Sequence, residues 1–497
     1  MIKGSEGELM IISKNYLTAL TDESAPEREI TARDENGALL FRLQLRLGRS
    51  GTPFYLDMRR FKGKDIRFYC SEEEFFFDAE TDEASKRSAN EQRLRPRFHY
   101  TVPYGWLNDP NGLAFFNGKY HIFCQHNPFG TQWGNMHWHH STTTDFLHFE
   151  HMGDALFPDC EGTIFSGSAV CDTRNVSGFG RNSLLLFYTL ASYDKPEFSQ
   201  CLAYSEDGVH FRKYEKNPII PNIKGENRDP KVVYVPEMSC YVMALYLDGD
   251  EYALFKSRNL TDWEQFQSVQ IEGDAECPDL YYLKDCDRWI LSGASDYYIV
   301  GRFDENGFSC EQKPLRFYCE LDGRYSYAGQ SFYGTDGRVL RLTWENINPE
   351  NNQCFCGQLS VPFEMGLTVL SNGEMRLRAS LCREIESRLR SVEYGQKISG
   401  PYVADIRFDS DFTADIDGVR LRISPSENRI LLGEKAIPLT LDGEKNIRLI
   451  VDRMSVEILA DNGLIFTSFK SVCNDDVHSL SVISGEADIS VLQINDE

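Results

Sequence analysis

Alternating apolar and polar positions predict strands along most of the chain. In the first 80 residues two runs alternate in this way, with apolar side chains at Phe41, Leu43, Leu45 and Leu47 and at Ile66, Phe68 and Cys70. A period of two is typical of half-buried strands. We therefore expect a small β-sandwich-like module over residues 1–80. A charged linker is expected over residues 81–97.

From Asn108 onward one pattern recurs: a polar head, an apolar strand, a turn and a longer apolar strand. In the first copy, Asn117-Gly118 separates two apolar runs, which is a strong hairpin signal. The heads read NDPNGLAFF, FSGSAV, RDPKVVYV, ECPDLYYL and YAGQSFY, and they begin at Asn108, Phe165, Arg228, Glu276 and Tyr327. A spacing of roughly 50–60 residues suits four-stranded propeller blades. The five units predict a five-bladed β-propeller over residues 98–365.

The last part of the chain returns to simple alternation. A helical spacing of Leu381, Ile385 and Leu389 indicates a short connecting helix. The segment 447–469 then alternates and turns at Asp461-Asn462-Gly463, as a sandwich hairpin does. We expect a C-terminal β-sandwich over residues 370–497 that supports the propeller. The predicted fold class is all-β.

The composition narrows the class of partner. The chain has 497 residues, with 52 Lys and Arg against 76 Asp and Glu and a net charge of −24. This acidic balance argues against nucleic acid and anionic membranes as partners, and it fits a neutral substrate such as a sugar. No stretch of 18 apolar residues occurs, and the 14 cysteines are scattered. We expect reduced thiols and a cytoplasmic location. The oligomeric state stays open.

Three acidic residues occupy equivalent places in the repeated heads. The first strands of propeller blades line one channel and enter it at the same end, so we expect Asp109, Asp229 and Glu276 to converge. Such crowding raises at least one carboxyl pKa. Paired carboxylates, one ionised and one protonated, are what glycoside cleavage needs. For Asp229 alone, a structural salt bridge with Arg228 is the alternative.

The motifs WLNDPNG, QHNP, WGNMHW, FSGSAV, RDPK and ECPD, in this order, resemble those of glycoside hydrolase family 32, the invertases and fructanases. The resemblance covers residues 98–497 and implies a propeller followed by a sandwich. It implies that Asp109 is the nucleophile, Glu276 the general acid/base and Asp229 the transition-state stabiliser. An N-terminal module similar to residues 1–80 precedes some bacterial fructanases. The residues that the resemblance places against the terminal fructose are Asn108, Gln125, Trp133, Ser168, Arg228 and Trp344.

The implied activity is release of terminal fructose, with retention, from β-fructofuranosides such as sucrose, fructo-oligosaccharides and inulin- or levan-type chains. In this mechanism Arg228 is expected to orient Asp229 through a charged fork. A fructosyltransferase, in which a sugar hydroxyl replaces water, is one alternative. A catalytically silent fructan-binding protein is another, and the three intact acids argue against it.

Two positions depart from the family pattern. His139 stands where glycine is usual, and Tyr325-Ser326 stand before Tyr327-Ala328, where an acidic residue is common. Both departures leave the preferred linkage and chain length open.

No metal or other cofactor is expected. Seven of the ten histidines lie between His121 and His151, and three of them form the run His137-x-His139-His140, which invites a metal interpretation. On a strand, however, the third of these points away from the other two, and no further ligand is evident. Cys277 beside Glu276 is interpreted as a buried cysteine that tunes its neighbour rather than as a nucleophile, since no histidine is placed to activate it.

Overall fold

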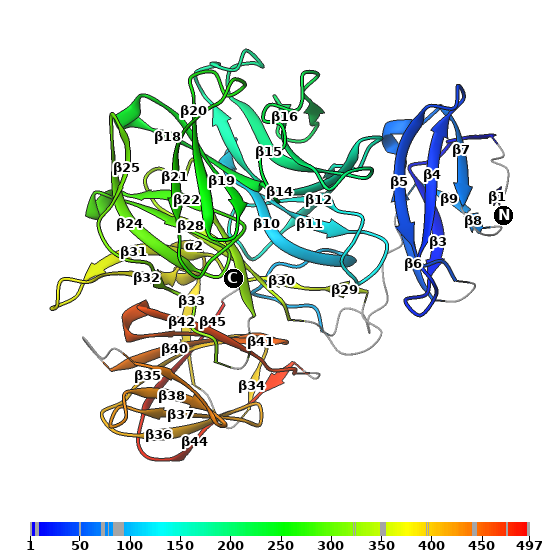
Figure 1. The fold of residues 1–497 in the computed structure, drawn as a ribbon. Helices are drawn as coiled ribbons and strands as arrows, with labels where there is room; N and C mark the ends of the chain where they lie inside the picture. The colour runs from blue at the N-terminus through cyan, green and yellow to red at the C-terminus, as the bar shows by residue number, and fades with distance from the viewer. Residues whose placement is uncertain are drawn as a thin grey trace.

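The computed structural model describes residues 2–494, except 5–8, 49–50, 71–74, 78, 83–93, 322, 324, 348–353, 394, 396, 440–444 and 474–475. Strands make up most of this part of the chain, which confirms the all-β prediction (Figure 1). Most of the predicted linker lies outside the described residues. No helix among those described is long and apolar enough to cross a membrane.

Residues 2–81 form an N-terminal unit, drawn in blue in Figure 1. One sheet has the order β2 (Leu9–Ile11), β7 (Asp65–Cys70), β4 (Arg28–Asp34) and β5 (Leu39–Leu45). The other has the order β6 (Thr52–Asp57), β3 (Tyr16–Thr21) and β9 (Ala79–Thr81), and β1 (Ile2–Gly4) pairs with β8 (Phe75–Phe77). The apolar face of each sheet contributes to one core, in which Phe41 and Ile66 lie with Leu17 and Phe54.

Residues 105–381 form five mainly antiparallel sheets within the described part of the chain. The first contains β10 (Gly105–Phe116), β11 (Lys119–Asn127), β12 (His137–Thr143) and β13 (Glu150–Leu156). The second contains β14 (Gly162–Asp172), β15 (Ser183–Ser192), β16 (Phe198–Ser205) and β17 (Arg212–Lys213). The third contains β18 (Arg228–Val235), β19 (Cys240–Asp248), β20 (Glu251–Ser257) and β21 (Glu264–Gln270).

The remaining two sheets follow the same order along the chain. The fourth contains β22 (Asp279–Leu283), β23 (Arg288–Ser292), β24 (Tyr297–Asp304), β25 (Gly307–Cys310) and β26 (Leu315–Arg316). The fifth contains β27 (Ser326–Ser331), β28 (Leu340–Glu345), β30 (Gln358–Leu359), β31 (Phe363–Val369) and β32 (Met375–Leu381). Because β31 and β32 complete this sheet, the predicted boundary at 365–370 is wrong. That boundary falls inside β31, and the last sheet continues to Leu381.

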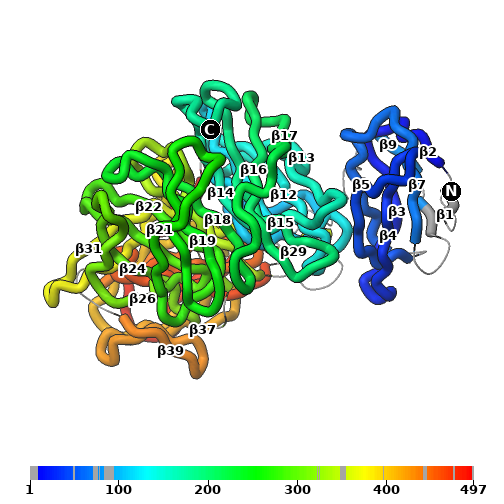
Figure 2. Tube along the Cα trace, turned by 45° about the horizontal axis from the view of Figure 1, so that its top comes forward, coloured from blue at the N-terminus to red at the C-terminus, as the bar shows by residue number. Residues whose placement is uncertain are grey.

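The first strands of the five sheets contact one another in a closed circle, β10, β14, β18, β22, β27 and again β10. We call this arrangement the sheet ring; Figure 2 shows it beside the N-terminal unit. The predicted heads lie in or directly before these five strands. β29 (Phe355–Cys356) pairs in parallel with β10 and so ties a late segment to the first sheet.

A C-terminal unit follows the short helix α2 (Arg383–Glu386), which lies where helical spacing predicted a connector. One sheet has the order β33 (Leu389–Val392), β45 (Asp488–Ile494), β35 (Tyr402–Arg407), β40 (Asn446–Val451), β41 (Ser455–Ala460) and β42 (Ile465–Lys470). The other has the order β39 (Lys435–Pro438), β38 (Arg429–Leu432), β37 (Val419–Ser424), β36 (Phe412–Ile416) and β44 (Leu480–Ser484). Smaller elements are β34 (Ile398–Ser399), β43 (Val477–His478) and the 3₁₀ turns η1 (Arg59–Phe61), η2 (Pro236–Met238), η3 (Lys284–Cys286) and η4 (Asp461–Gly463).

One buried carboxylate, that of Asp452, joins the C-terminal unit to the segment that leads into β10. It accepts hydrogen bonds from the backbone N–H groups of Arg97, Phe98 and His99, the second of these at 2.7 Å. The His99 ring also donates to it from Nδ1 at 3.0 Å. Because Asp452 and His99 are buried, this carboxylate fixes the path of the chain just before the head NDPNG.

Candidate active site

Irregular backbone marks one end of the sheet ring. The pairing register shifts between Leu107 and Pro110 in β10, between Phe165 and Gly167 in β14, between Arg228 and Lys231 in β18, and between Tyr327 and Gln330 in β27. In the fourth sheet, β22 begins just after two residues with positive φ, Glu276 at 58° and Cys277 at 35°. Bulges re-aim side chains and are common beside active sites. The five heads therefore turn side chains out of the regular pleat.

The three predicted acids come together around Cys277. Its Sγ lies 3.5 Å from Oδ2 of Asp109 and 3.4 Å from Oδ2 of Asp229, and its backbone N–H donates to that second carboxylate at 3.0 Å. Glu276 precedes this cysteine directly. Burial raises the pKa of the Cys277 thiol well above its usual range, and the neighbouring acids raise it further. The thiol is therefore protonated, which agrees with its interpretation as a non-nucleophilic neighbour.

Asp109 lies inside the irregular part of β10, and its carboxylate is partly exposed. The Ser166 hydroxyl donates to its Oδ2 at 2.6 Å. Burial raises the pKa of Asp109 above its ordinary value, and the charge of Glu276 raises it further, while hydrogen bonds from Ser166 and Asn108 act in the opposite direction. The bonds hold one oxygen in place and leave an ionisable carboxylate at the opening of the ring.

Asp229 occupies a left-handed backbone conformation with φ 66°, and its side chain is buried. Its N–H donates to the hydroxyl of Thr189 at 2.9 Å. Burial, together with the charges of Asp109 and Glu276, raises the pKa of Asp229 to about 7, although the charge of Arg228 acts in the opposite direction. The expectation that crowding raises at least one carboxyl pKa is thus confirmed for two of the three acids.

Glu276 is held by two donors. Nη2 of Arg228 donates to its Oε1, and the hydroxyl of Tyr327 donates to its Oε2, both at 2.7 Å. About a third of its side chain is exposed (34%), against 6% for Asp229, so solvent reaches this carboxyl group. A tyrosine hydroxyl can donate to a carboxylate or accept from a protonated carboxyl, and so suits either protonation state.

The prediction that Arg228 orients Asp229 through a charged fork is wrong. Its Nη1 and Nη2 atoms bond Glu226 and Glu276, each at 2.7 Å, whereas Nε lies 3.7 Å from Oδ2 of Asp229. Burial lowers the pKa of this arginine, but the surrounding acids more than offset it. The guanidinium therefore bridges two glutamates, and Asp229 is held by the Cys277 N–H instead.

Four of the residues expected to contact fructose lie near the acids. Asn108 precedes Asp109, and its Oδ1 accepts the indole N–H of Trp106 at 2.8 Å. Gln125 donates to the Ser166 hydroxyl at 3.3 Å, and its buried Oε1 has no partner among the described residues. Arg228, as described, bonds Glu276. The ring of Trp344 contacts the rings of Trp106 and Tyr327.

Ser168 needs a correction. Its side chain is buried, and its hydroxyl donates to the Pro230 carbonyl at 2.7 Å and accepts the Val232 N–H at 3.0 Å. It therefore links β14 to β18, and its buried hydroxyl has already committed its one donor within the protein. The register shift in β14 instead presents Ser166 to Asp109. Both serines belong to the motif FSGSAV, but the pattern alone did not show which one the bulge exposes.

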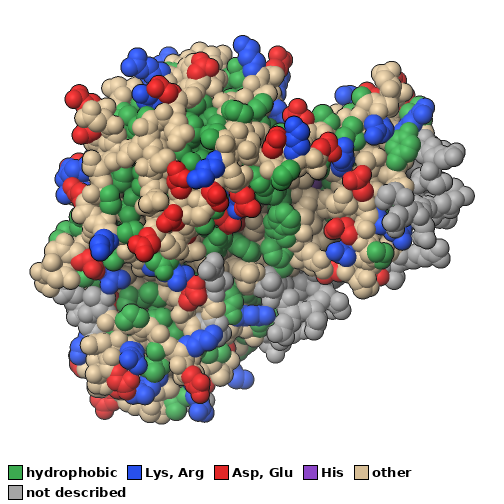
Figure 3. Space-filling view, in the orientation of Figure 1, with side chains coloured by type: hydrophobic (Ala, Val, Ile, Leu, Met, Phe, Trp, Pro, Cys, Tyr) green, Lys and Arg blue, Asp and Glu red, His purple; other side chains and the backbone are tan. Residues whose placement is uncertain are grey.

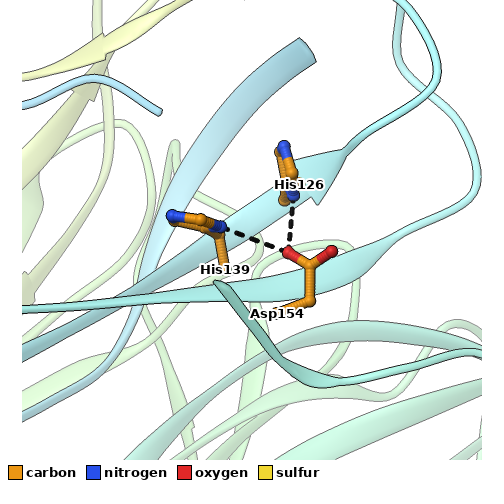
Figure 4. A group of neighbouring side chains, drawn as sticks. All are labelled: His126, His139 and Asp154. Atoms are coloured by element: carbon orange, nitrogen blue, oxygen red, sulfur yellow. Dashed lines mark hydrogen bonds and ion pairs between the residues drawn. The ribbon is translucent and has the colours of Figure 1, made fainter. Parts of the chain in front are cut away.

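The histidine-rich first sheet contains one of three groups with metal-ligand potential among the described residues. Figure 4 shows His126, His139 and Asp154, drawn together from β11, β12 and β13. The carboxylate of Asp154 accepts from both rings, at 2.7 and 3.3 Å, and Nε2 of His126 donates to the Tyr104 carbonyl at 2.9 Å. Both nitrogens of His126 are thus engaged within the protein. His137, which the sequence pattern paired with His139, is not part of this group.

The remaining two groups lie elsewhere: Asp417, Cys473 and His478 in the C-terminal unit, and His99, Glu345 and Glu457 at its junction with the ring. Neither includes a residue of the acidic trio. Hydrolysis by two carboxylates does not call for an ion.

Comparison with known proteins places the chain in a family. The model of the glycosyl hydrolases family 32 N-terminal domain matches residues 99–377. A levanase of Bacillus subtilis is 31% identical over 453 residues, which cover 77% of this chain and 67% of that protein. A sucrose-6-phosphate hydrolase of Escherichia coli is 30% identical over 460 residues, covering 80% of this chain and 93% of that protein.

A solved structure supports the fold. An exo-inulinase from Aspergillus awamori superposes with a TM-score of 0.70 at 22% identity, over 81% of this chain and 98% of its own. The family model matches more than half of the chain, and it includes the heads that bear all three acids. The chain therefore belongs to glycosyl hydrolase family 32 and is a glycosidase.

Proposed function

We propose that this glycosidase is a β-fructofuranosidase that releases terminal fructose with retention of configuration. The observation that carries the proposal is the convergence of Asp109, Asp229 and Glu276 around Cys277 at one end of the sheet ring. The names of the similar levanase and sucrose-6-phosphate hydrolase support a fructoside as substrate. The acidic surface, mixed with basic side chains on the face in Figure 3, suits an uncharged sugar.

The proposal includes the finer architecture. Each sheet of the ring is taken as one blade of a five-bladed β-propeller, because the first strands contact one another in a closed circle. The N-terminal and C-terminal units are taken as two-layer sandwiches. In the C-terminal unit, Ile406 and Ile447 of one sheet share a core with Ala414 and Ile423 of the other.

The mechanism follows from the positions of the acids. Asp109 attacks the anomeric carbon of fructose, the bond from this carbon to the glycosidic oxygen breaks, and Glu276 gives its proton to that oxygen. A water molecule then loses a proton to Glu276 and attacks the same carbon, which frees fructose and restores Asp109. Two displacements at one carbon retain its configuration.

The surrounding groups have matching tasks. The Ser166 hydroxyl holds one oxygen of Asp109, so the other oxygen is available for attack. Arg228 and Tyr327 hold the two oxygens of Glu276 and keep it at the exposed side, where the leaving group departs. Asp229 stabilises the positive charge that develops on the fructosyl ring.

The test is an assay of the full chain on sucrose, kestose, inulin and levan, with chromatography of the products. We expect free fructose, and Asp109→Asn should fold normally while losing several orders of magnitude in turnover. The same substitution at an exposed aspartate after β16, Asp207→Asn, is the control, and we expect it to leave turnover normal. Products longer than the substrate would show transfer instead of hydrolysis. Near-normal activity of Asp109→Asn would refute the nucleophile.

A further inference from the structure

The N-terminal unit holds the loop that carries Trp133 through hydrogen bonds. This loop joins β11 to β12. On one side of the tryptophan, the N–H of Thr131 donates to Oε1 of Glu23 at 2.9 Å, and its hydroxyl donates to the same oxygen. On the other side, Asn135 exchanges two hydrogen bonds with the backbone of Gln44, at 2.7 and 2.8 Å. The two contacts bracket Trp133 along the chain.

A residue of the sheet ring, Asn127, also holds this loop. The side chain of Asn127, at the end of β11, donates to the Gln132 carbonyl at 2.8 Å and accepts the Phe129 N–H at 3.1 Å. Phe129 also packs edge-on against Phe54 of the N-terminal unit, with ring centroids 5.2 Å apart. Backbone groups on both sides of Trp133 are therefore held by two separate units.

A second loop of the same end of the ring is held in a similar way. Between β15 and β16, Asp194 pairs with Arg42 of the N-terminal unit at 2.9 Å, and the Tyr193 hydroxyl donates to the Arg42 carbonyl at 2.9 Å. Strand pairing places this loop beside Gly162, at the start of the strand that also carries Ser166. In Figure 1 the N-terminal unit lies beside the sheet that contains β11 and β12, and in Figure 3 this unit and the rest of the molecule are in contact.

Trp133 itself is 58% exposed, although it is held so firmly at the backbone. Its ring packs edge-to-face with the ring of Phe165, with the two ring centroids 5.8 Å apart. Phe165 directly precedes Ser166, the serine that bonds Asp109. Phe165 in turn contacts Phe198, and the guanidinium of Arg228 lies over that ring. A row of aromatic rings thus runs from Trp133 to the arginine that holds Glu276.

We propose that the N-terminal unit belongs to the substrate-recognition apparatus: through Glu23 and the backbone of Gln44, which bind Thr131 and Asn135 of the loop, it positions Trp133 as a platform for a sugar ring of the bound fructoside. An exposed indole with an ordered backbone presents a large apolar face at low entropic cost. A loop without these bonds would have to be ordered at each binding event, which weakens binding. Glu23 and Asn135 are positioning residues, and they do not take part in the chemistry. The inference rests on the proposed function.

The experiment compares Glu23→Ala and Asn135→Gly with the wild type on sucrose and kestose. Glycine tolerates the φ of 47° at position 135, so this variant removes the side-chain bonds without backbone strain. We expect KM to rise about three- to tenfold, as for the loss of a hydrogen bond, with kcat changed less than about twofold. Glu35→Ala, at an exposed glutamate in the turn between β4 and β5, is the matched control and should leave both constants unchanged.

A double-mutant cycle separates positioning from general loosening of the fold. In a Trp133→Ala background, Glu23→Ala should have no further effect on KM, because the group through which it acts is gone. A full additional effect there, or variants that match the Glu35 control, would overturn the inference while the proposed function stands. If the wild type cleaves no fructoside at all, the proposed function fails, and the inference fails with it. Melting temperatures of all variants verify that they are folded.

Discussion

At the scale of single residues, the site contains backbone conformations and buried acidic groups that are energetically unfavourable. Asp229, Glu276, Cys277 and Ala328 all have positive φ, which non-glycine residues rarely adopt, and all lie in or beside the heads. Two acids there have raised pKa values because burial and neighbouring charges oppose their ionisation. Such strain persists only where the surrounding structure enforces it, and it is typical of catalytic sites.

One prediction concerns the stability cost of Asp229. Its pKa is about 7 in the folded state and about 4 when unfolded, so the folded state binds more protons between these values. Stability therefore falls as pH rises from 4 to 7 and stays low above 7. Asp229→Asn removes this penalty and should stabilise the protein by about 2–4 kcal/mol at pH 8 and by much less at pH 4.5. Urea unfolding at both pH values is the measurement; an equal difference at both would contradict the assignment.

A second prediction separates Glu276 from Asp229 by leaving group. Glu276 must protonate the departing oxygen, so Glu276→Gln should be severely impaired on sucrose but form the fructosyl-enzyme much faster from fructosyl fluoride, which needs little protonation. Asp229→Asn should be impaired with both donors, by roughly 3 kcal/mol or more, because it acts on the sugar ring. The measurement is the pre-steady-state rate of leaving-group release by each variant from each donor. A similar response of both variants would mean that the roles are not divided in this way.

At the scale of elements, bulges decide which side chains reach the site. A regular β14 would place Ser166 and Ser168 on the same face, since residues two apart share a face. The register shift between Phe165 and Gly167 separates their tasks, so that one hydroxyl bonds Asp109 and the other bonds β18. Bulges arise from pairing with a neighbouring strand, and a local pattern of polar and apolar residues does not reveal them.

Gly167 permits this arrangement, which gives a third prediction. A Cβ at this position would lie 1.9 Å from the backbone carbonyl oxygen of Phe187 in β15. Gly167→Ala should therefore force the two strands apart, lower the melting temperature by several degrees and reduce activity by displacing Ser166. Gly395→Ala, at an exposed glycine with open space around its Cβ and no positive φ, shows how much a single methyl costs without a clash. Equal melting temperatures for both variants would argue against this account.

The sequence sufficed for the repeating elements and for the acids. Turn signals and alternation are local, so all five heads and the acids within them could be placed from the chain alone. The end of the ring could not, because β31 and β32 alternate like sandwich strands and only their pairing with β28 assigns them to the ring. The hydrogen bond between Glu23 and Thr131 joins residues that are 108 positions apart in the sequence, and no pattern in residues 1–80 indicated it.

At the scale of the whole molecule, a buried charge cluster joins the C-terminal unit to the ring. His99 lies between Asp452 at 3.0 Å and Glu457 at 3.3 Å, and Glu345 of β28 completes the group. Burial and the charge of Glu457 together raise the pKa of Glu345 to about 8, against the opposing charge of His99. Removing one partner from such a group leaves the others buried without compensation.

The fourth prediction tests this junction. Asp452→Asn keeps the shape of the side chain but loses the charge that pairs with His99. It should lower the free energy of unfolding by about 3–5 kcal/mol, the range for a broken buried ion pair. Asp409→Asn, at an exposed position of the same unit, should have almost no effect. Denaturant unfolding followed by tryptophan fluorescence measures both; a small effect of Asp452→Asn would show that the junction does not depend on this charge.

The parallel pairing of β29 with β10 also has a consequence for folding of the protein during its synthesis on the ribosome. The first sheet receives its last strand from residues 355–356, which are made long after Gly105. At typical rates of synthesis the first sheet would wait on the order of ten seconds or more for this partner. During that interval Gly105 and Trp106, at the start of the strand that bears the nucleophile, lack this partner and are open to wrong pairing. Slower translation of this stretch should therefore lengthen exposure to chaperones and lower the yield of soluble enzyme.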